Sequence, residues 1–276
     1  MTRKIKSALV YAALIIGVAA IMFPIYICVI TTFKTPAETA ISYFKLPESF
    51  YLGNYLDILS NPKLYYAYGN TFYITIFSLL GSLLLMPAMS FAISRGMAES
   101  KPFKIIYYYL LVGIFIPFQV RMVPLVKLLS SIGMMSQSGL VILYIAHATC
   151  ESVFLYTGYL ATMSSSMEEA AYIDGAGTLQ IYWKVVFPLM KPMIVTVMIR
   201  EGLAMWNDYL LPLITLNKSW KMWTLTLFQN AFQAEFSVNY SQAFACFVLA
   251  SLPIVLFYLV MQKHIIGGLT SGAVKG

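Results

Sequence analysis

Three ionisable residues interrupt long apolar stretches of the sequence: Glu151 in one stretch, and Arg200 and Glu201 in a later one. An ionised side chain in an apolar medium costs about 2.5–3.5 kcal/mol unless it is paired or faces water. Two arrangements satisfy this condition. Glu151 and Arg200 form a structural ion pair that holds the two stretches together, or these side chains line a hydrated path for a polar substrate. Both interpretations remain open.

A second polar group follows shortly afterwards, where Trp206, Asn207 and Asp208 are consecutive. An aromatic ring beside an amide and a carboxylate offers the flat face and the hydrogen-bonding groups that a sugar requires. Tryptophan and polar residues also gather where a membrane helix meets water, so an interfacial belt explains the same residues. The candidate substrate path therefore comprises Glu151, Arg200, Trp206, Asn207 and Asp208.

The sequence pattern does not supply the residues of a metal, catalytic or nucleotide site. His147 lies in apolar surroundings and His264 lies near the C-terminus, and neither has a cysteine or histidine partner at metal-binding spacing. No Gly-x-x-x-x-Gly-Lys-Ser/Thr motif occurs. We therefore expect no catalytic residue, metal or cofactor in this chain, and any ATP that drives it would be bound by another subunit.

A stretch too polar to cross a bilayer runs from Ser166 to Pro188, within a loop over 164–188. Ser166 and Glu169 have the spacing of a capping box, which predicts a short helix over 167–173. A plain amphipathic hairpin lying on a membrane is the alternative. Such helices favour a basic polar face, whereas this one begins with two glutamates.

A turn and a second helix are expected to complete this loop. Asp174 and Gly175 interrupt the first helix, because glycine accepts turn conformations that other residues resist. A second short helix is predicted over 179–187, with Pro188 in the first turn of the long helix that follows. The loop is therefore predicted to be a helix–turn–helix at a membrane surface.

Composition makes a lipid bilayer the expected solvent. The 276 residues are 60% hydrophobic and only 11% charged, with a mean hydropathy of +0.76, whereas a soluble domain has about 25% charged residues. The net charge of +7 does not indicate nucleic-acid binding, because the lysines and arginines are spread among apolar segments. The apolar run near the N-terminus is too long for a signal peptide and is interpreted as a retained first span.

Six segments are long enough to cross a bilayer, which needs about 20 apolar residues per helix. They cover residues 8–31, 71–93, 103–126, 139–160, 188–211 and 242–261. Lysine and arginine at the segment ends favour cytoplasmic termini. The prediction is an all-α polytopic membrane protein with one transmembrane domain over 1–276. The loop over 164–188 and a tail over 263–276 would then be cytoplasmic.

Two short motifs resemble those of ABC importer permeases. The loop resembles the EAA loop of that family in six residues, Glu169, Ala170, Ala171, Asp174, Gly175 and Ala176, and Val185 to Pro188 stands in place of its Ile-x-Leu-Pro end. The C-terminal run resembles the tail of the maltose-type (carbohydrate) permeases, and it includes Gly268, Leu269, Thr270 and Lys275. The two motifs occur in the family's order.

This resemblance implies a transmembrane permease subunit of an ATP-driven importer for carbohydrate, and an oligosaccharide in particular. It implies a bacterial plasma-membrane location and four further subunits or proteins: a second permease in a heterodimer, two cytoplasmic ATP-binding subunits and an extracellular sugar-binding protein. In that family the loop residues from Glu169 to Pro188 dock into the ATPase, whose closure switches the path between inward-facing and outward-facing states. The tail docks there as well.

Two other functions deserve comparison. An ion-coupled secondary transporter would need more intramembrane carboxylates than Glu151 and Glu201, together with broken helices at midplane. An integral-membrane enzyme would need clustered His, Asp or Glu at one depth, and two scattered histidines do not provide such a cluster. The sequence therefore favours an importer subunit.

Overall fold

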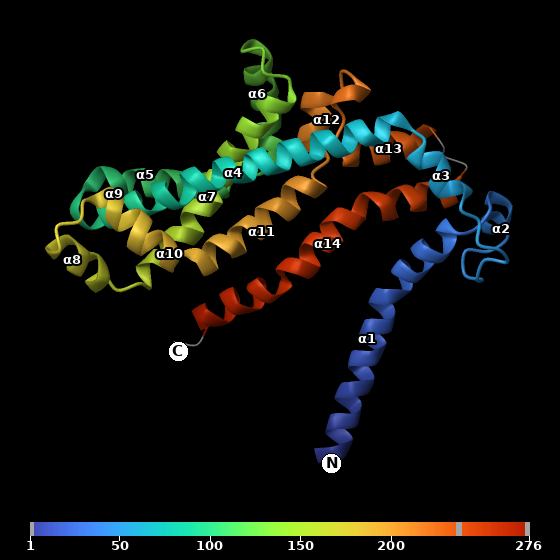
Figure 1. The fold of residues 1–276 in the computed structure, drawn as a ribbon, viewed down its shortest axis with the longest axis horizontal. Helices are drawn as coiled ribbons and strands as arrows, with labels where there is room; N and C mark the ends of the chain where they lie inside the picture. The colour runs from blue at the N-terminus through green and yellow to red at the C-terminus, as the bar shows by residue number, and fades with distance from the viewer. Residues whose placement is uncertain (1–2, 236–238, 274–276) are drawn as a thin grey trace.

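The computed structural model describes residues 3–235 and 239–273, and it is built from helices (Figure 1). In chain order these are α1 (Arg3–Thr32), α2 (Pro36–Ile41), α3 (Gly53–Leu59), α4 (Pro62–Glu99), α5 (Lys101–Ile114), α6 (Phe118–Ser131), α7 (Gln137–Ala161), α8 (Ser166–Ile173), α9 (Thr178–Ile181), the π-helix η1 (Tyr182–Val186), α10 (Phe187–Leu189), α11 (Lys191–Asn207), α12 (Leu210–Leu216), the 3₁₀-helix η2 (Trp220–Met222), α13 (Leu225–Glu235) and α14 (Tyr240–Ala273). The predicted all-α membrane class is confirmed.

Within the described residues, four helices are each long and apolar enough to cross a membrane, namely α1, α4, α7 and α14. Two further pairs of helices pass the same test only when each pair is taken together. The pair α5 and α6 is bent by 106°, and the pair formed by residues 178–189 and α11 is bent by 73°. The predicted six spans are reached only if each bent pair counts as one span.

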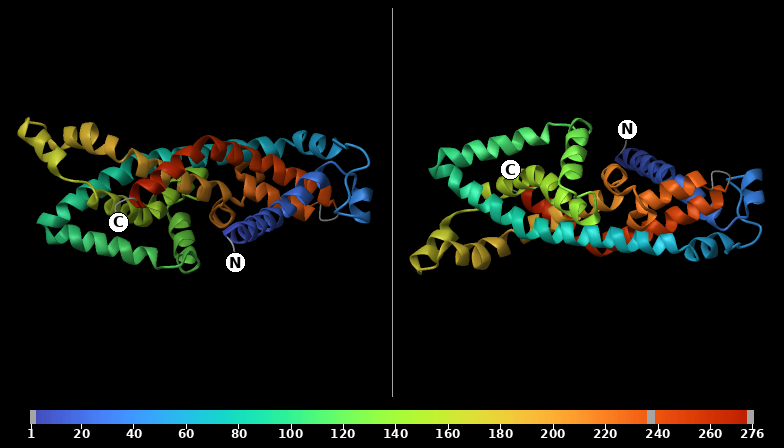
Figure 2. Two further views of the ribbon diagram at one scale, coloured as in Figure 1. Left: turned by 90° about the horizontal axis from the view of Figure 1, so that it is seen from below. Right: turned by 90° about the horizontal axis from the view of Figure 1, so that it is seen from above.

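The predicted third span, over 103–126, is not one continuous helix. The helix α5 ends at Ile114 after 14 residues, or about 21 Å, and this is shorter than the roughly 30 Å bilayer core. Pro117 precedes α6 and disfavours a helical conformation at Ile116. Figure 2 shows α6 turned away from α5 as a result.

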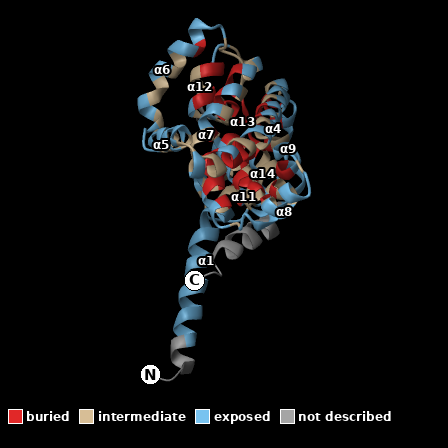
Figure 3. Cartoon of the chain, turned by 90° about the vertical axis from the view of Figure 1, so that its left-hand side faces the viewer, coloured by how far each residue is buried: buried red, intermediate tan, exposed pale blue. Residues whose placement is uncertain are grey.

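The helices α4, α7, α11 and α14 run alongside one another and form the body of the protein (Figure 1). Their contacts bury the apolar side chains at the centre, while α1 contacts α14 and is exposed along most of its length (Figure 3). Only 6% of its most apolar window is buried. The candidate residues Glu151 and Arg200 lie on α7 and α11, two of the helices that form this body.

A short cap connects α1 to α4 through α2 and α3. Thr35 and Glu38 form a capping box at the start of α2, with the Glu38 carboxylate accepting from the Thr35 amide at 2.7 Å. The same carboxylate accepts from the Glu48 amide at 2.9 Å. The Asn54 side chain donates to the Thr32 and Lys34 carbonyls, both at 2.8 Å. These bonds fix the loop to the end of α1.

The chain turns sharply where it enters α11. The helix formed by residues 178–189 ends at Met190, and α11 leaves it at 73°. The prediction that Pro188 occupies the first turn of this long helix is wrong, because Pro188 lies before the bend. Pro192 occupies the first turn of α11 instead.

Candidate functional site

The predicted helix–turn–helix is present and projects from one end of the molecule, where α8 and α9 lie at the left of Figure 1. The Ala176 amide donates to the Ala171 carbonyl and the Gly175 amide to the Tyr172 carbonyl, both at 3.0 Å. These two bonds form a Schellman motif, which ends α8 with a left-handed residue. Gly175 supplies that residue with a φ of +82°, so the turn requires glycine there.

The start of α8 differs from the prediction. The helix begins at Ser166, one residue early, and Ser165 occupies the N-cap position. The predicted capping box between Ser166 and Glu169 does not form, because the Glu169 carboxylate accepts a hydrogen bond from the Ser165 hydroxyl instead. The Ser166 amide donates to the Ser164 hydroxyl at 3.3 Å. Three adjacent serines thus compete for one helix start.

The outer surface of this helix–turn–helix is unusually apolar. Tyr172, Ile173 and Leu179 are 74%, 84% and 73% exposed, and Met167 is also exposed. Glu169, Ala170 and Asp174 are exposed on the same helix–turn–helix, while Ala171 and Ala176 are half-buried. Pro188 is exposed further along the chain, in α10. Contiguous exposed apolar side chains rimmed by polar groups are typical of a surface that binds another protein.

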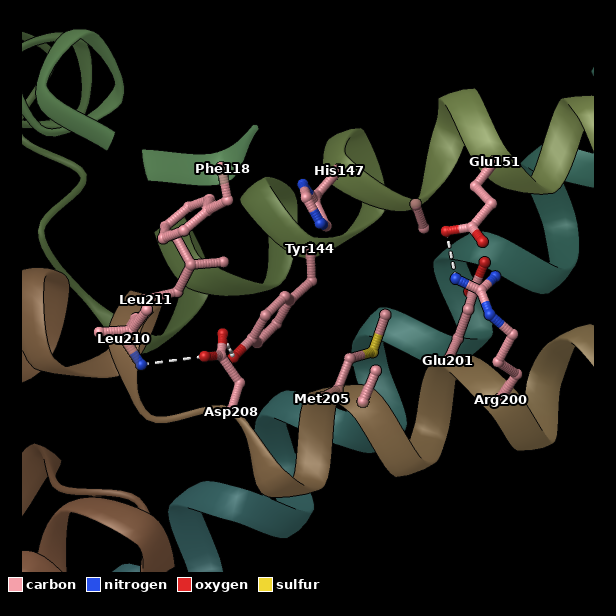
Figure 4. Close-up of a pocket in the computed structure, with 12 residues that line it drawn as sticks. Phe118, Tyr144, His147, Glu151, Arg200, Glu201, Met205, Asp208, Leu210 and Leu211 are labelled. Carbon is pink, nitrogen blue, oxygen red and sulfur yellow. Dashed lines mark hydrogen bonds and ion pairs between the residues drawn. The ribbon is translucent and has the colours of Figure 1, made fainter. Parts of the chain in front are cut away.

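A second feature is a cavity of about 250 Å³ in the body of the protein (Figure 4). Its walls come mainly from α7 and α11, and the start of α12 and Phe118 of α6 complete it. The lining residues are Phe118, Tyr144, His147, Ala148, Glu151, Arg200, Glu201, Ala204, Met205, Asp208, Leu210 and Leu211. Most of its polar groups lie on the two facing helices.

Two polar contacts cross the cavity from α7 to α11 and its C-terminal end. Glu151 and Arg200 form an ion pair, and their side chains remain 47% and 45% exposed. The Tyr144 hydroxyl donates to Asp208 Oδ2 at 2.9 Å, while Asp208 Oδ1 accepts from the Leu210 amide at 2.9 Å. The cavity therefore presents fixed charges of both signs without burying them completely.

Glu201 lies at the inner edge of the same cavity and is almost fully buried, at 5% exposure. The Ser152 hydroxyl of α7 donates to its Oε1. Its Oε2 has no hydrogen-bond partner within the described part of the chain. Glu201 therefore joins α7 to α11 through Ser152 and keeps its second oxygen buried.

The cavity brings together three of the five residues of the predicted substrate path: Glu151, Arg200 and Asp208. Arg200, Ala204 and Asp208 share a face because they are four residues apart on a helix of 3.6 residues per turn. Trp206 points elsewhere, is 7% exposed and packs edge-on against Phe72 at 5.0 Å.

Asn207 also does not line the cavity, since its amide donates to the Leu203 carbonyl at 2.8 Å. The cavity contains residues that the substrate-path prediction missed, Phe118, Tyr144 and His147. The spacing of Tyr144, His147 and Glu151 along α7 is the i, i+3, i+7 pattern of one helical face and was the available signal.

A second opening of about 390 Å³ lies on the other side of the break between α11 and α12. Tyr209 and Trp223 supply aromatic faces, and Asn217 and Asn230 supply amides. The indole Nε1 of Trp223 is buried without a hydrogen-bond partner among the described groups. The aromatic and amide groups predicted at Trp206 and Asn207 thus have counterparts here, without the carboxylate that Asp208 was expected to add.

The predicted tail is described only in part. The helix α14 continues beyond the predicted end of the sixth span and reaches Ala273, so Gly268, Leu269 and Thr270 lie within it. Lys275 lies outside the described residues.

Comparison with known proteins gives a consistent family. The family of binding-protein-dependent transport system inner membrane components matches residues 72–270. The chain is 39% identical over 266 residues to the multiple sugar-binding transport system permease protein MsmG of Streptococcus mutans, and the match covers 96% of each chain. It is 32% identical over 277 residues to the melibiose/raffinose/stachyose import permease protein MelC of Bacillus subtilis, covering 100% of this chain and 98% of MelC.

A solved structure shares the fold as well. It belongs to a bacterial ABC transporter involved in the import of the acidic polysaccharide alginate, with a TM-score of 0.81 and 22% sequence identity, and the match covers 95% of this chain and 98% of that one. The apolar helices, the family match over 72–270 and the full-length relatives agree with one another. The chain is a multi-pass membrane protein that belongs to the family of binding-protein-dependent transport system inner membrane components.

Proposed function

We propose that this chain is a permease subunit of a bacterial ATP-driven importer for carbohydrate, with an oligosaccharide as its cargo. Full-length relatives are named as permeases for multiple sugars and for melibiose, raffinose and stachyose. The observation that carries the proposal for this chain is the polar cavity between α7 and α11. The family match supports a binding-protein-dependent importer over the alternative from the sequence, an ion-coupled secondary transporter.

The size and chemistry of the cavity suit one end of a sugar chain. Carboxylates, a guanidinium and a tyrosine hydroxyl offer acceptors and donors for hydroxyl groups, and Phe118 offers an apolar face. A volume of about 250 Å³ lies below the roughly 300–1,000 Å³ of typical ligand pockets. An oligosaccharide would therefore need a second permease subunit to supply the rest of the path, as a heterodimer would.

We assign the helix–turn–helix of α8 and α9 as the docking site of a cytoplasmic ATP-binding subunit. Its residues Glu169, Ala170, Ala171, Asp174, Gly175, Ala176 and Pro188 would form the contact together with the exposed apolar side chains. The Schellman motif makes the turn rigid, so a force applied to it would move it as one body. The chain then continues through the bend at Met190 into α11, which carries Arg200 and is followed directly by Asp208. Movement at the docking site would thus reach the cavity wall directly.

The remaining assignments follow from the same arrangement. The whole chain acts as a single permease domain with both termini in the cytoplasm, and the tail residues Gly268, Leu269, Thr270 and Lys275 make a second contact with the ATPase. ATP is bound and hydrolysed by two partner subunits, and this chain performs no catalysis itself. An extracellular binding protein delivers the sugar.

Uptake of labelled oligosaccharides by vesicles that contain the chain with its partner subunits tests this proposal. With binding protein outside and ATP at the cytoplasmic face, uptake should continue when ionophores remove all ion gradients. It should stop when ATP is withdrawn. Uptake that depends on an ion gradient and not on ATP would overturn the proposal. Uptake of peptides or amino acids in place of sugars would overturn the assignment of carbohydrate as the cargo.

A substitution in the turn tests the docking site separately. Gly175→Arg should leave the chain inserted in the membrane but reduce co-purification of the ATP-binding subunits and abolish uptake, because a large charged side chain would occupy the docking surface. Normal co-purification and uptake in that variant would contradict the assignment of α8 and α9.

A further inference from the structure

Arg95, near the C-terminal end of α4, reaches across to the first turn of α8. Its Nη2 lies 2.6 Å from Glu168 Oε1, and its Nε lies 3.2 Å and 3.0 Å from Glu168 Oε1 and Oε2. Its Nη1 donates to the Leu160 carbonyl, in the last turn of α7, at 3.4 Å. One guanidinium thus binds three helices at the end of the molecule from which α8 projects.

The contact fixes an orientation as well as a distance. Two guanidinium nitrogens face both carboxylate oxygens, and this forked geometry is one that lysine cannot reproduce. The two side chains are only 29% and 14% exposed, so water screens them less than a surface pair. The neighbouring Glu169 faces outward and is bonded to Ser165. The side chains of Glu168 and Glu169 therefore point in opposite directions, Glu168 towards the body of the protein and Glu169 towards solvent.

The Arg95–Glu168 ion pair is important because α8 makes few other contacts with the long helices. No residue of α8 is buried, and its helix contacts are chiefly with α9 and η1, which belong to the same projection. By contrast, η1 is anchored by Tyr182 and Val186, which pack with Phe91 of α4 and Tyr156 of α7. Of the ion pairs within the described side chains, Arg95–Glu168 is the one that connects α8 to another helix.

The pair also bridges the linker between α7 and α8. Residues 162–165 join the two helices, and Arg95 binds Leu160 before this linker and Glu168 after it. Through α7 the contact reaches Glu151 and Tyr144, which form the cavity wall opposite α11. The projection is therefore connected covalently to α11 and by the packing of η1 to α4 and α7, while Arg95 connects α8 itself to α4 and α7.

We propose that Arg95 is a positioning residue that makes α8, α4 and α7 move together, so that both cavity walls respond to one docking event. This inference rests on the proposed docking of an ATP-binding subunit on α8 and α9. Without the Arg95–Glu168 pair, α8 would turn about the linker, and a force on α8 would reach α4 and α7 only through α9 and η1. ATP would then be hydrolysed without a proportional transfer of sugar.

The test compares ATP hydrolysis and sugar uptake in the same vesicles, using the whole complex. Arg95→Gln and Glu168→Gln should keep the ATP-binding subunits bound and active while sugar transported per ATP falls by at least about fivefold, the lower end of ordinary coupling between sites. The exchange Arg95→Glu with Glu168→Arg should recover a large part of the ratio. Arg95→Lys keeps the positive charge but loses the forked hydrogen bonding. Its ratio of sugar transported per ATP should lie between those of the wild type and Arg95→Gln.

Two control variants separate this role from charge and from docking. Lys104→Gln removes an exposed cation on α5, near the same end of the molecule, and should leave the ratio unchanged. Glu169→Gln should weaken co-purification of the ATP-binding subunits instead of changing the ratio for the complexes that form.

Three outcomes would overturn the inference. The first is an unchanged ratio in Arg95→Gln and Glu168→Gln. The second is a set of additive losses that the exchange does not recover, since additivity means that the two residues act separately. The third is a loss of folded protein in Arg95→Lys and the exchange variant alike, which would make the pair purely structural. If the wild-type chain does not bind an ATP-binding subunit at all, the proposed docking site fails instead, and co-purification shows this directly.

Discussion

The hydroxyl of Tyr144 on α7 donates to the carboxylate of Asp208 at 2.9 Å, directly after α11 ends at Asn207. The same carboxylate accepts from the Leu210 amide, at the start of α12. Three helices therefore meet at one carboxylate in the wall of the cavity.

Tyr144→Phe is expected to lower maximal sugar uptake by about tenfold, because a hydrogen bond to a charged group contributes about 1.5–3 kcal/mol. The Asp208 carboxylate would lose one of the two contacts that orient it in the cavity. Uptake at saturating binding protein measures the effect. The control is Tyr73→Phe, which removes a 3.2 Å contact with Ser138 that joins α4 to α7 and does not line the cavity. Equal effects of the two substitutions would contradict a role of Asp208 in the path.

Glu151→Gln should reduce the yield of folded protein, because it leaves the Arg200 guanidinium without its carboxylate inside the apolar body. Adding Arg200→Gln should restore much of the yield. The effect should be modest, about 1 kcal/mol, because both side chains are nearly half exposed to the cavity. Thermal unfolding of the purified variants in detergent provides the measurement. Independent losses that add together would mean that the ion pair does not stabilise the fold.

Gly175→Ala should destabilise the turn between α8 and α9 by about 1–2 kcal/mol, because a β-carbon is disfavoured at a φ of +82°. No atom lies within 4 Å of the added β-carbon, so the cost arises from the backbone and not from a clash. Gly177→Ala is the matched control, since Gly177 has an ordinary φ of −73° and equally open surroundings. Hydrogen exchange of the backbone amides at positions 175 and 176 measures the effect locally, in the wild type and in each variant. Similar exchange rates in both variants would refute the Schellman geometry.

The cap between α1 and α4 should lose stability in acid. Hydrogen bonds from the Thr35 amide and then from the Glu48 amide lower the pKa of Glu38 below its usual value. A carboxyl whose pKa is lower in the folded state stabilises that state above its unfolded pKa of about 4.3. That stabilisation is lost as the pH falls through the lowered value.

Limited proteolysis of the cap between pH 7 and pH 3 would measure this effect. Glu38→Gln should be more susceptible than the wild type at pH 7 and should change less on acidification. Glu48→Gln serves as the control, because the bond to Glu38 uses the Glu48 backbone and not its side chain. A wild-type cap whose susceptibility is the same at both pH values would show that the carboxylate does not stabilise it.

The sequence was informative where structure is decided locally. Asp174 and Gly175 predicted a turn, and that turn needs glycine because of its own backbone conformation. The start of α8 was predicted less well, because Ser164, Ser165 and Ser166 all carry hydroxyls that could cap a helix. Local preference alone does not choose among them.

Features that depend on the rotation of a helix or on contacts between distant residues could not be predicted from local sequence patterns. Trp206 and Asp208 are close in the sequence, yet two residues correspond to about 200° of rotation on a helix, so Asp208 lines the cavity while Trp206 packs against Phe72 instead. Arg95 and Glu168 are 73 residues apart, and their pairing follows from how α4 and α7 pack. Pro117 explains a break near the end of α5, but the 106° direction of α6 depends on the helices beneath it.

The 73° bend at Met190 gives α11 the geometry of a lever. Its 17 residues extend about 25 Å, so a swing of only about 10° around the bend would displace the far end by about 4 Å. Such a stroke exceeds the 2.9 Å separation between Tyr144 and Asp208. A small rotation at the bend would therefore be enough to break the hydrogen bond between Tyr144 and Asp208 at the opposite end of α11.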